Sequence, residues 1–299
     1  MPAIIAFSLI HALQAAEVDA NRLSIGRAGT AVIQPGQMWD LRSNKACTMT
    51  DVIQAADGKR FVFLGEQHAT AAHQQMEADV VQALDAAKRQ VVVGMEMFTR
   101  PKQDVLDQWS AGSLTEDQFL EQSDWKGQWG YDYKFYRPVF EVAKGHHLPI
   151  VGLNVPRGWV RTVGKTGFNS LPVSARMQLP ESLFLGNKTH REVFDAMVGP
   201  HNMPGMNADS MYGAQVLWDE GMADTAIKYL NCTTTTPETV FVVIAGAGHM
   251  MYGQGINYRI GRRKAGRGIN LVMVESDKAV ELSRGIADFA FVCQKPAAK

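Results

Sequence analysis

The sequence predicts an α/β fold with a mostly parallel central sheet flanked by helices. Short apolar runs rich in β-branched residues recur along the chain, at 61–64, 91–95, 148–153, 240–244 and 271–274. Runs of this kind that do not alternate with polar residues are typical of strands buried on both faces. The segments between several of them are long enough for the helical crossovers that parallel strands require. We expect the run at 271–274 to form the last strand.

The segment between the first two predicted strands, residues 69–88, has the spacing of an amphipathic helix. Its apolar residues Met76, Val80 and Leu84 recur every four positions, which places them on one helical face. The first three elements therefore read as strand, helix and strand. We expect the two strands to be parallel neighbours in a buried sheet.

Beyond the second strand the chain is mostly helical. Thr115 is a good N-cap for one helix, and residues 131–144 form another candidate. Residues 157–201 are broken up by Gly, Pro and Ser, which predicts short helices and loops. Residues 206–230 keep an apolar spacing of three to four positions and predict a long helix.

Composition excludes several classes of protein. The 299 residues are 46% hydrophobic, and 30 basic residues balance 30 acidic ones. Without an overall positive field, the chain is not expected to bind nucleic acid or an anionic membrane. The three cysteines lack the close spacing of a zinc ribbon or a redox motif. No run beyond the N-terminus reaches the roughly 18 apolar residues of a transmembrane span.

The N-terminus resembles a secretory signal peptide. An apolar stretch at 2–10 is followed by small residues, although the usual basic residues are lacking. We therefore expect a signal peptide at 1–20 and export to the periplasm or cell envelope. No lipobox cysteine follows, so a lipid anchor is not supported. The main domain is expected at 38–275, followed by a C-terminal extension at 276–299.

Acidic and imidazole side chains follow the predicted strands. One strand is followed by Glu66 and His68, the next contains Glu96 at its end, and a later one is followed by His249. Both histidines close a Gly-x-x-His motif. Because ligands in open α/β sheets gather at the carboxyl ends of strands, we expect these groups to converge. Asn154, which ends another strand, is expected close by.

Such a group has more than one chemical interpretation. Two carboxylates and two imidazoles are suitable ligands for Zn, Mn or Fe, and they also suit general acid and base catalysis. Alternatively, each histidine serves only to cap a helix or to satisfy buried backbone groups. Two further tyrosines, Tyr252 and Tyr258, lie just beyond His249, and a phenolate is a credible ligand for ferric iron.

Nucleotide cofactors are not expected. The glycines at 246 and 248 would need a third glycine at the position of Met251 to form a dinucleotide fingerprint. The run Gly164-Lys165-Thr166 looks like part of a phosphate loop, but five residues instead of four separate it from Gly158.

Two other clusters have open interpretations. The basic run at 259–267 forms either a solvated face or a partner for carboxylates. The aromatic residues between 125 and 136 either belong to the core or wall a flat apolar ligand.

Six motifs in order resemble a known family. They are Gly65-Glu66-x-His68, Gly94-Met95-Glu96-Met97-Phe98, Tyr136-Arg137-Pro138, Asn154-Val155-Pro156-Arg157, the segment 215–223, and Gly246-x-Gly248-His249-x-x-Tyr252-Gly253. Together they look like the ChaN-type haem-binding family of the Tiki and erythromycin-esterase-like superfamily. The resemblance covers residues 38 to 275. It implies an exported α/β domain that binds haem in iron acquisition, with a homodimer as one arrangement.

The resemblance yields two functional hypotheses. The first is a haem-binding protein in which Tyr252, the preferred iron ligand, acts with His249, His68, Asn154 and Arg157. The second, drawn from the superfamily's metal-dependent peptidases and esterases, is a hydrolase. There Glu66, His68 and His249 would hold a divalent metal (Zn, Mn or Fe), with Glu66 and Glu96 as the catalytic carboxylates. The resemblance places haem binding first, whereas the residues alone favour the metal hydrolase.

Overall fold

A computed structural model of the chain describes residues 18–198 and 207–296. The predicted signal peptide at 1–20 therefore falls outside the described residues up to position 17. Within the described part, no helix is both long and apolar enough to cross a membrane.

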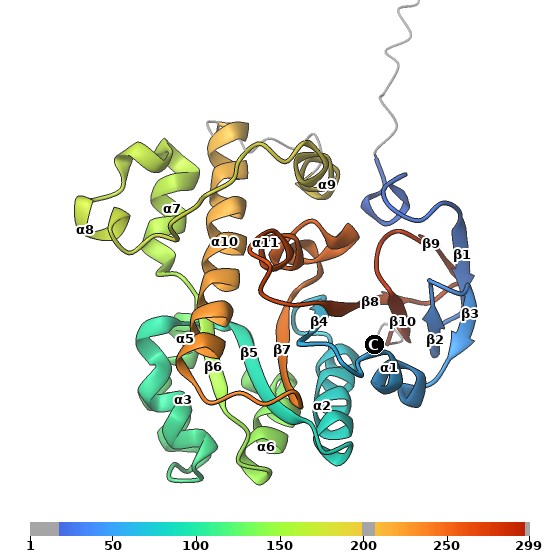
Figure 1. Cartoon of the computed structure of the whole chain (residues 1–299), viewed down its shortest axis with the longest axis horizontal. Helices are drawn as coiled ribbons and strands as arrows, with labels where there is room; N and C mark the ends of the chain where they lie inside the picture. Colours follow the sequence, from blue (N-terminus) through green and yellow to red (C-terminus); the bar gives the residue numbers. More distant parts are fainter. Residues whose placement is uncertain (1–17, 199–206, 297–299) are drawn as a thin grey trace, which may run out of the picture.

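An eight-stranded sheet forms the centre of the molecule, in the order β3-β2-β10-β8-β4-β7-β5-β6 (Figure 1). The strands from β10 to β6 all run parallel to their neighbours. Their bounds are β4 Phe61–Glu66, β5 Gln90–Thr99, β6 Ile150–Asn154, β7 Thr239–Gly246, β8 Gly268–Ser276 and β10 Phe289–Gln294. The predicted fold class, a mostly parallel sheet flanked by helices, is confirmed.

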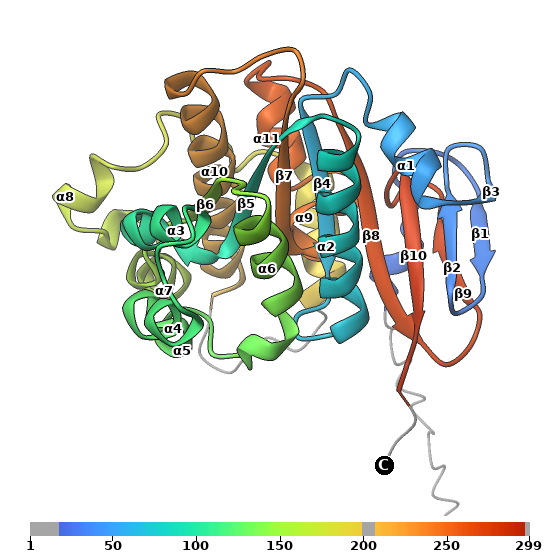
Figure 2. The same cartoon turned by 90° about the horizontal axis from the view of Figure 1, so that it is seen from below.

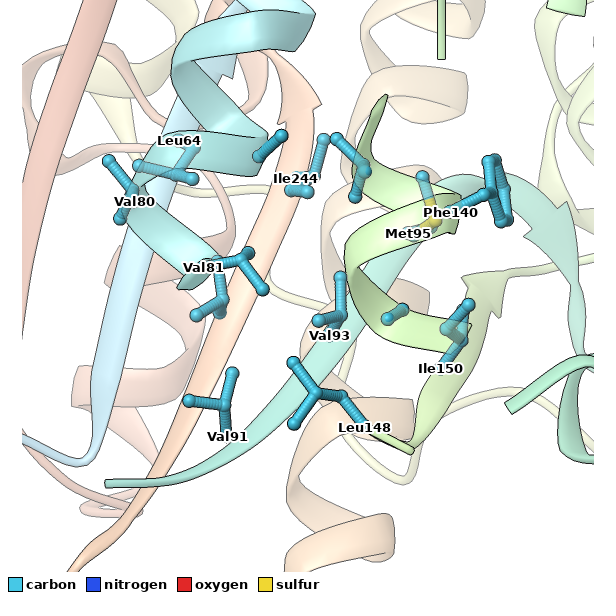
Figure 3. Packing of buried hydrophobic residues seen from close by; sticks show 14 of the residues in the cluster. Leu64, Val80, Val81, Val91, Val93, Met95, Phe140, Leu148, Ile150 and Ile244 are labelled. Atoms are coloured by element: carbon cyan, nitrogen blue, oxygen red, sulfur yellow. The ribbon is translucent and has the colours of Figure 1, made fainter. Parts of the chain in front are cut away.

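One face of the sheet is covered by α2 (Ala71–Ala86) and α6 (Arg137–Gly145), which lie side by side in Figure 2. Val80 and Val81 of α2 and Phe140 of α6 are fully buried in the cluster that contains the inward side chains of this face. Figure 3 shows these residues directed at the strands, toward neighbours such as Leu64 and Ile244. The four-residue spacing predicted for residues 69–88 therefore marks the buried side of α2.

The opposite face is covered by α10 (Ala208–Cys232) and α11 (Ile256–Arg262) (Figure 2). Met222 and Ala226 of α10 and Ile260 of α11 pack with Phe63 and Phe241 from the strands. Side chains that alternate along β4 and β7 thus enter two different cores. This explains why both strands are apolar without interruption.

The remaining helices surround these layers. Their bounds are α1 Met49–Ala55, α3 Gln103–Ser110, α4 Glu116–Ser123, α5 Trp125–Gln128, α7 Arg157–Thr166, α8 Val173–Arg176 and α9 Lys188–Val198. Thr115 caps α4 as predicted, since its side chain accepts a hydrogen bond from the Gln118 amide while Gln118 reaches back to the Thr115 amide. The segment 157–198 contains short helices, also as predicted.

The chain ends build one edge of the molecule together. β2 (Gln37–Asp40) pairs with β10 and β3 (Lys45–Cys47) pairs with β2, while β1 (Thr30–Ile33) and β9 (Val280–Ser283) form a separate two-stranded sheet. These strands gather on the right of Figure 1. The prediction that residues 271–274 form the last strand is wrong, because β9 and β10 follow it.

Candidate functional site

The site lies where three adjacent parallel strands end. β7 is hydrogen-bonded to β4 on one side and to β5 on the other, and Glu66 at the end of β4 is in register with Gly246 at the end of β7. Glu96 lies near the end of β5. The structure therefore brings Glu66, His68, Glu96 and His249 to one edge of the sheet, as the sequence predicted.

Glu66 and His68 form the first half of the site. His68 Nδ1 lies 2.6 Å from Glu66 Oε1, which also accepts a hydrogen bond of 2.9 Å from the Tyr136 hydroxyl. Gln74 Nε2 donates to the other carboxylate oxygen at 2.6 Å. Glu66 is only 2% exposed, so these donors replace the water that a buried carboxylate requires. The carboxylate is thus held by three side chains and orients the His68 ring.

His68 keeps one nitrogen available. Nε2 has no hydrogen-bond partner within the described ranges, and 29% of the side chain is exposed. Burial alone would lower the pKa of His68, but the hydrogen bond to Glu66 and the charge of Glu96 outweigh it and raise the pKa above 6.5. His68 is therefore an oriented, partly exposed imidazole, and its unpaired Nε2 lies beside Gly246, where a Cβ atom would be 3.2 Å from that nitrogen.

His249 is enclosed on both sides in the second half of the site. Its Nδ1 lies 2.6 Å from Asp219 Oδ1, and its Nε2 lies 3.3 Å from Glu96 Oε1. Burial opposes its charge, but the two carboxylates raise the pKa of His249 to about 10. Burial likewise opposes the charge of Glu96, and His249 lowers the Glu96 pKa to about 2. Both nitrogens of this charged imidazole are used inside the protein.

Asp219 links the second half to α10 and α11. Its Oδ2 lies 3.0 Å from His190 Nε2 and 3.5 Å from Arg259 Nη1, and all three side chains are at most 1% exposed. Burial would raise the pKa of Asp219, but Arg259 and the two histidines lower it well below its usual range. The sequence-based prediction did not assign Asp219 to the site. An acidic residue within the apolar spacing of the predicted 206–230 helix was the available signal.

Gly246 keeps the two halves close. A Cβ atom at this position would lie 3.0 Å from His68 Cε1 and 3.7 Å from Glu96 Oε2, so the glycine leaves the space that the His68 ring occupies. Its amide donates a hydrogen bond of 2.8 Å to Glu96 Oε2. The glycine of the second motif thus serves the histidine of the first.

Known proteins place this chain in a family. The family described as "Haem-binding uptake, Tiki superfamily, ChaN" matches residues 52–260, which is more than half of the chain. The chain belongs to this ChaN-type family. No curated protein sequence matches it.

One solved structure shows the same fold, and two others are more distantly similar. A structure described as "Cofacial heme binding to ChaN of Campylobacter jejuni" is similar with a TM-score of 0.66 and 17% identity, covering 85% of this chain and 95% of that one. An erythromycin esterase mutant, EreC in its open conformation, has a TM-score of 0.48 and 12% identity, covering 81% of this chain and 77% of that one. The type III effector HopBA1 has a TM-score of 0.44 and 10% identity, covering 89% and 97%. The last two similarities say nothing about the function of this chain.

Aromatic side chains lie against His68, and an apolar one lies against Gly248 in the second motif. The Trp129 ring meets the His68 ring edge-on with 4.7 Å between centroids, and Tyr131 lies at 5.8 Å with 44% of its surface exposed. Met197 of α9 is 45% exposed and lies against Gly248. The predicted aromatic cluster thus divides, since Trp125, Tyr133 and Tyr136 are buried in the core while Trp129 and Tyr131 flank the histidine.

Asn154 and Arg157 support the same edge. Asn154 Nδ2 donates to the Glu96 carbonyl at 3.0 Å, so this buried amide fixes the strand end instead of facing outward. Arg157 is exposed and donates to the Gly127 carbonyl at 3.2 Å. Burial lowers the pKa of Arg157, and the nearby charge of Glu96 acts in the opposite direction. Arg157 is therefore a cation at the rim of the site.

Tyr252 is not brought to this group. Its hydroxyl donates to the Ala20 carbonyl at 2.8 Å and accepts a hydrogen bond of 2.9 Å from the Leu23 amide. The ring is 5% exposed, and burial raises the Tyr252 pKa to about 12, which disfavours the phenolate that would bind iron. The hydroxyl thus anchors the N-terminal segment. Tyr258 stacks against Phe184.

Three arginines of the basic run at 259–267 pair with carboxylates of the protein itself. Arg259 is fully buried beside Asp219 and Glu220, and Arg262 and Arg263 bind the Glu220 carboxylate. For the buried Arg259 the interpretation as a solvated face is wrong, whereas Arg262 is exposed and still pairs with a carboxylate. The charges of the three arginines offset those of Asp219 and Glu220 in α10.

The predicted metal ligands Glu66, His68 and His249 do not form a coordination sphere. The imidazole nitrogens of His249 face Asp219 and Glu96, and Glu66 already accepts hydrogen bonds from three side chains. Among residues 18–198 and 207–296, no group of three or more His, Cys, Asp and Glu side chains could hold a metal ion. Of the two imidazoles at this site, only His68 has a ring nitrogen without a partner among the described residues.

Proposed function

We propose that this protein binds haem on the open side of the Glu66–His68 pair, with His68 Nε2 as the iron ligand. The observation that carries the proposal is the contrast between the two imidazoles. His68 Nε2 has no hydrogen-bond partner among the described residues and the side chain is 29% exposed, whereas both nitrogens of His249 contact carboxylates. Membership in a haem-binding uptake family supports haem as the ligand.

The hydrogen bond between His68 Nδ1 and Glu66 suits this role. A carboxylate that accepts from one imidazole nitrogen fixes the tautomer, so that the lone pair resides on the other nitrogen. It also raises the basicity of that nitrogen, which strengthens an axial bond to iron. Tyr136 and Gln74 hold Glu66 in place, so they position the ligand without touching it.

The surroundings of His68 match the remaining parts of haem. Trp129, Tyr131 and Met197 offer apolar surface to a flat macrocycle. The exposed guanidinium of Arg157 lies near Glu96 and suits a propionate carboxylate, because arginine binds carboxylates in a bidentate manner. The iron would supply the coordination bond, and the protein would supply the ligand, the walls and the cation.

The cellular part of the proposal rests on the family and on the N-terminus. We assign the protein to haem uptake at the cell envelope, with the apolar segment 2–10 acting in its export. The similar ChaN of Campylobacter jejuni binds haem cofacially, and for this chain we include in the proposal a homodimer in the haem-loaded form. Light scattering with and without hemin tests this, since the proposal requires a doubled mass in the loaded form.

A hemin titration with matched variants tests the site. We expect the wild type to produce a saturable Soret band at micromolar protein. His68→Ala should shift the band and weaken binding by roughly tenfold or more, as loss of an iron ligand implies. His146→Ala is the control, because that histidine is similarly exposed but pairs with Asp85.

Three outcomes would contradict parts of this proposal. An unchanged band and affinity in His68→Ala would refute His68 as the ligand. If Tyr131→Phe changed the band instead, the neighbouring phenol would be the ligand, and haem binding would stand at the same face. If neither the wild type nor any of the variants produced a saturable Soret band, haem binding itself would be refuted.

A further inference from the structure

A cavity of about 540 Å³ lies apart from the His68 site. It is bounded by the beginning of β8, by α11 and by glycine-rich turns near residues 26 and 285. We propose that it binds a small organic anion that also carries a hydrogen-bond donor, such as a hydroxylated phosphate monoester. This ligand is distinct from haem, and the inference does not depend on the proposed haem site.

Asn270 provides a buried acceptor in the wall of the cavity. The residue is 6% exposed, and its Nδ2 donates to the Met250 carbonyl at 2.7 Å. Within the described residues its Oδ1 has no hydrogen-bond partner. A buried acceptor that lacks a partner is costly, so a donor from outside the protein is expected there. A hydroxyl or amine of a ligand would supply it.

The charged residues of the lining favour an anion. Arg27 is paired with Asp288, and Asp288 also accepts from the Asn270 amide, so this pair is internally satisfied. Lys59 and Arg267 also line the cavity, and the ion pairs found among residues 18–198 and 207–296 involve neither of them. Their two positive charges therefore remain for a carboxylate or phosphate group.

The shape of the cavity suits a small molecule. Its volume falls within the roughly 300–1,000 Å³ of typical ligand pockets. Phe63 and Ile260 give it an apolar part, and a Cβ atom at Gly261 would meet nothing within 4 Å. Since Gly261 lies in α11 with an ordinary helical φ, a larger side chain there fills space without straining the helix.

Isothermal titration of the full chain tests the proposal, with glycerol 3-phosphate, inorganic phosphate and glycerol as probes. Glycerol 3-phosphate carries both the anion and the donor, so we expect it to bind, and more tightly than either of the other two. The double variant Lys59→Gln/Arg267→Gln and the cavity-filling Gly261→Leu should each weaken it by roughly tenfold or more, as loss of charge-assisted hydrogen bonds or of space implies. Lys278→Gln, an exposed lysine outside the cavity, is the control.

Several results would overturn the inference. One is an absence of binding at millimolar glycerol 3-phosphate, and another is an equal loss in Lys278→Gln, which would indicate general charge attraction. A third is displacement of glycerol 3-phosphate by hemin in both the wild type and His68→Ala, which would assign the cavity to haem. Binding that is lost only in the cavity variants and that hemin does not affect supports a separate anion site.

Discussion

The two Gly-x-x-His motifs share a pattern but place their histidines in opposite environments. His68 follows β4, is 29% exposed on its side chain, and contacts one carboxylate through one nitrogen. His249 follows β7, is 10% exposed on its side chain, and contacts carboxylates through both nitrogens. The motif therefore specifies a place at the strand end, and the packed neighbours decide what the imidazole can do there.

The difference originates in the helices above each strand end. After His68 the chain enters α2, and besides Glu66 and Gly246 the ring contacts the partly exposed aromatic residues Trp129 and Tyr131. His249 instead contacts Asp219 of α10, and Asp219 is itself held by His190 and Arg259. We infer that the first half meets the ligand, while the second half holds the strand ends together electrostatically.

Replacing Asp219 should disrupt the half of the site that contains His249, and it should give the largest loss of stability among these predictions. Asp219→Asn keeps the size of the side chain but removes the negative charge between His249, His190 and Arg259. Removing one partner of a buried ion pair costs about 3–5 kcal/mol, because the remaining charges are left uncompensated. Urea unfolding measures this loss, and the hemin spectrum of the folded variant should stay like that of the wild type.

The matched control is Asp195→Asn, whose exposed carboxylate pairs with Arg191. Its loss should cost less than about 1 kcal/mol, as for other surface ion pairs. If Asp219→Asn instead kept its stability and lost the Soret band, the assignment of the two halves would be reversed.

Changes in pH should affect the His68 half and the His249 half of the site differently. Their effect on stability should be smaller than that of Asp219→Asn. His249 has a pKa raised to about 10 from 6.5, so its stabilising charge is fully present below pH 6.5 and is lost as pH rises toward 10. The Glu96 pKa is lowered to about 2 from 4.5, so its contribution is present above pH 4.5 and is lost as pH falls toward 2. Because the two groups stabilise each other, both losses report largely on the same ion pair.

Hemin affinity should show a different dependence. The iron ligand must be neutral, so affinity should rise as pH increases through the raised pKa of His68, while the unfolding free energy is already beginning to fall. Unfolding and hemin titrations at matched pH values, spanning neutral to mildly alkaline conditions, measure both trends. His249→Gln should reduce the alkaline loss of stability to the part that His68 contributes. Parallel trends in both quantities would mean that one histidine controls both.

Much of the fold followed from the sequence, because buried parallel strands leave a strong local signal. The uninterrupted apolar runs at β4, β5 and β7, and the helical spacing of α2, reflect packing on both faces of the sheet. β9 and β10 were missed because their place depends on pairing with β1 and β2, at the other end of the chain. Such long-range pairing has no local pattern.

The part of the site that lies at strand ends was also predictable, because the strands themselves could be located in the sequence. Residues directly at strand ends, such as Glu66 and Glu96, were found because topology places them there. Asp219 was not, since it reaches His249 from the middle of α10, across the sheet edge. The sequence also could not show that Glu220 would neutralise Arg262 and Arg263, because that requires the packing of α10 against α11.

Replacing Tyr252 should have the smallest effect on stability, and it tests whether this residue lies outside the half of the site that contains His249. It lies shortly beyond His249 in the chain, yet its hydroxyl joins the Ala20 carbonyl and the Leu23 amide. Tyr252→Phe removes these bonds and should cost about 1–3 kcal/mol, toward the lower end because water can reach the nearby surface. The Soret band should not change, since the phenol does not face His68.

Urea unfolding and a hemin titration of one preparation test both statements, with Tyr258→Phe as the control for a phenol outside this contact. A lost or shifted band in Tyr252→Phe alone would restore the phenolate as iron ligand and would require the N-terminal segment to move when haem binds.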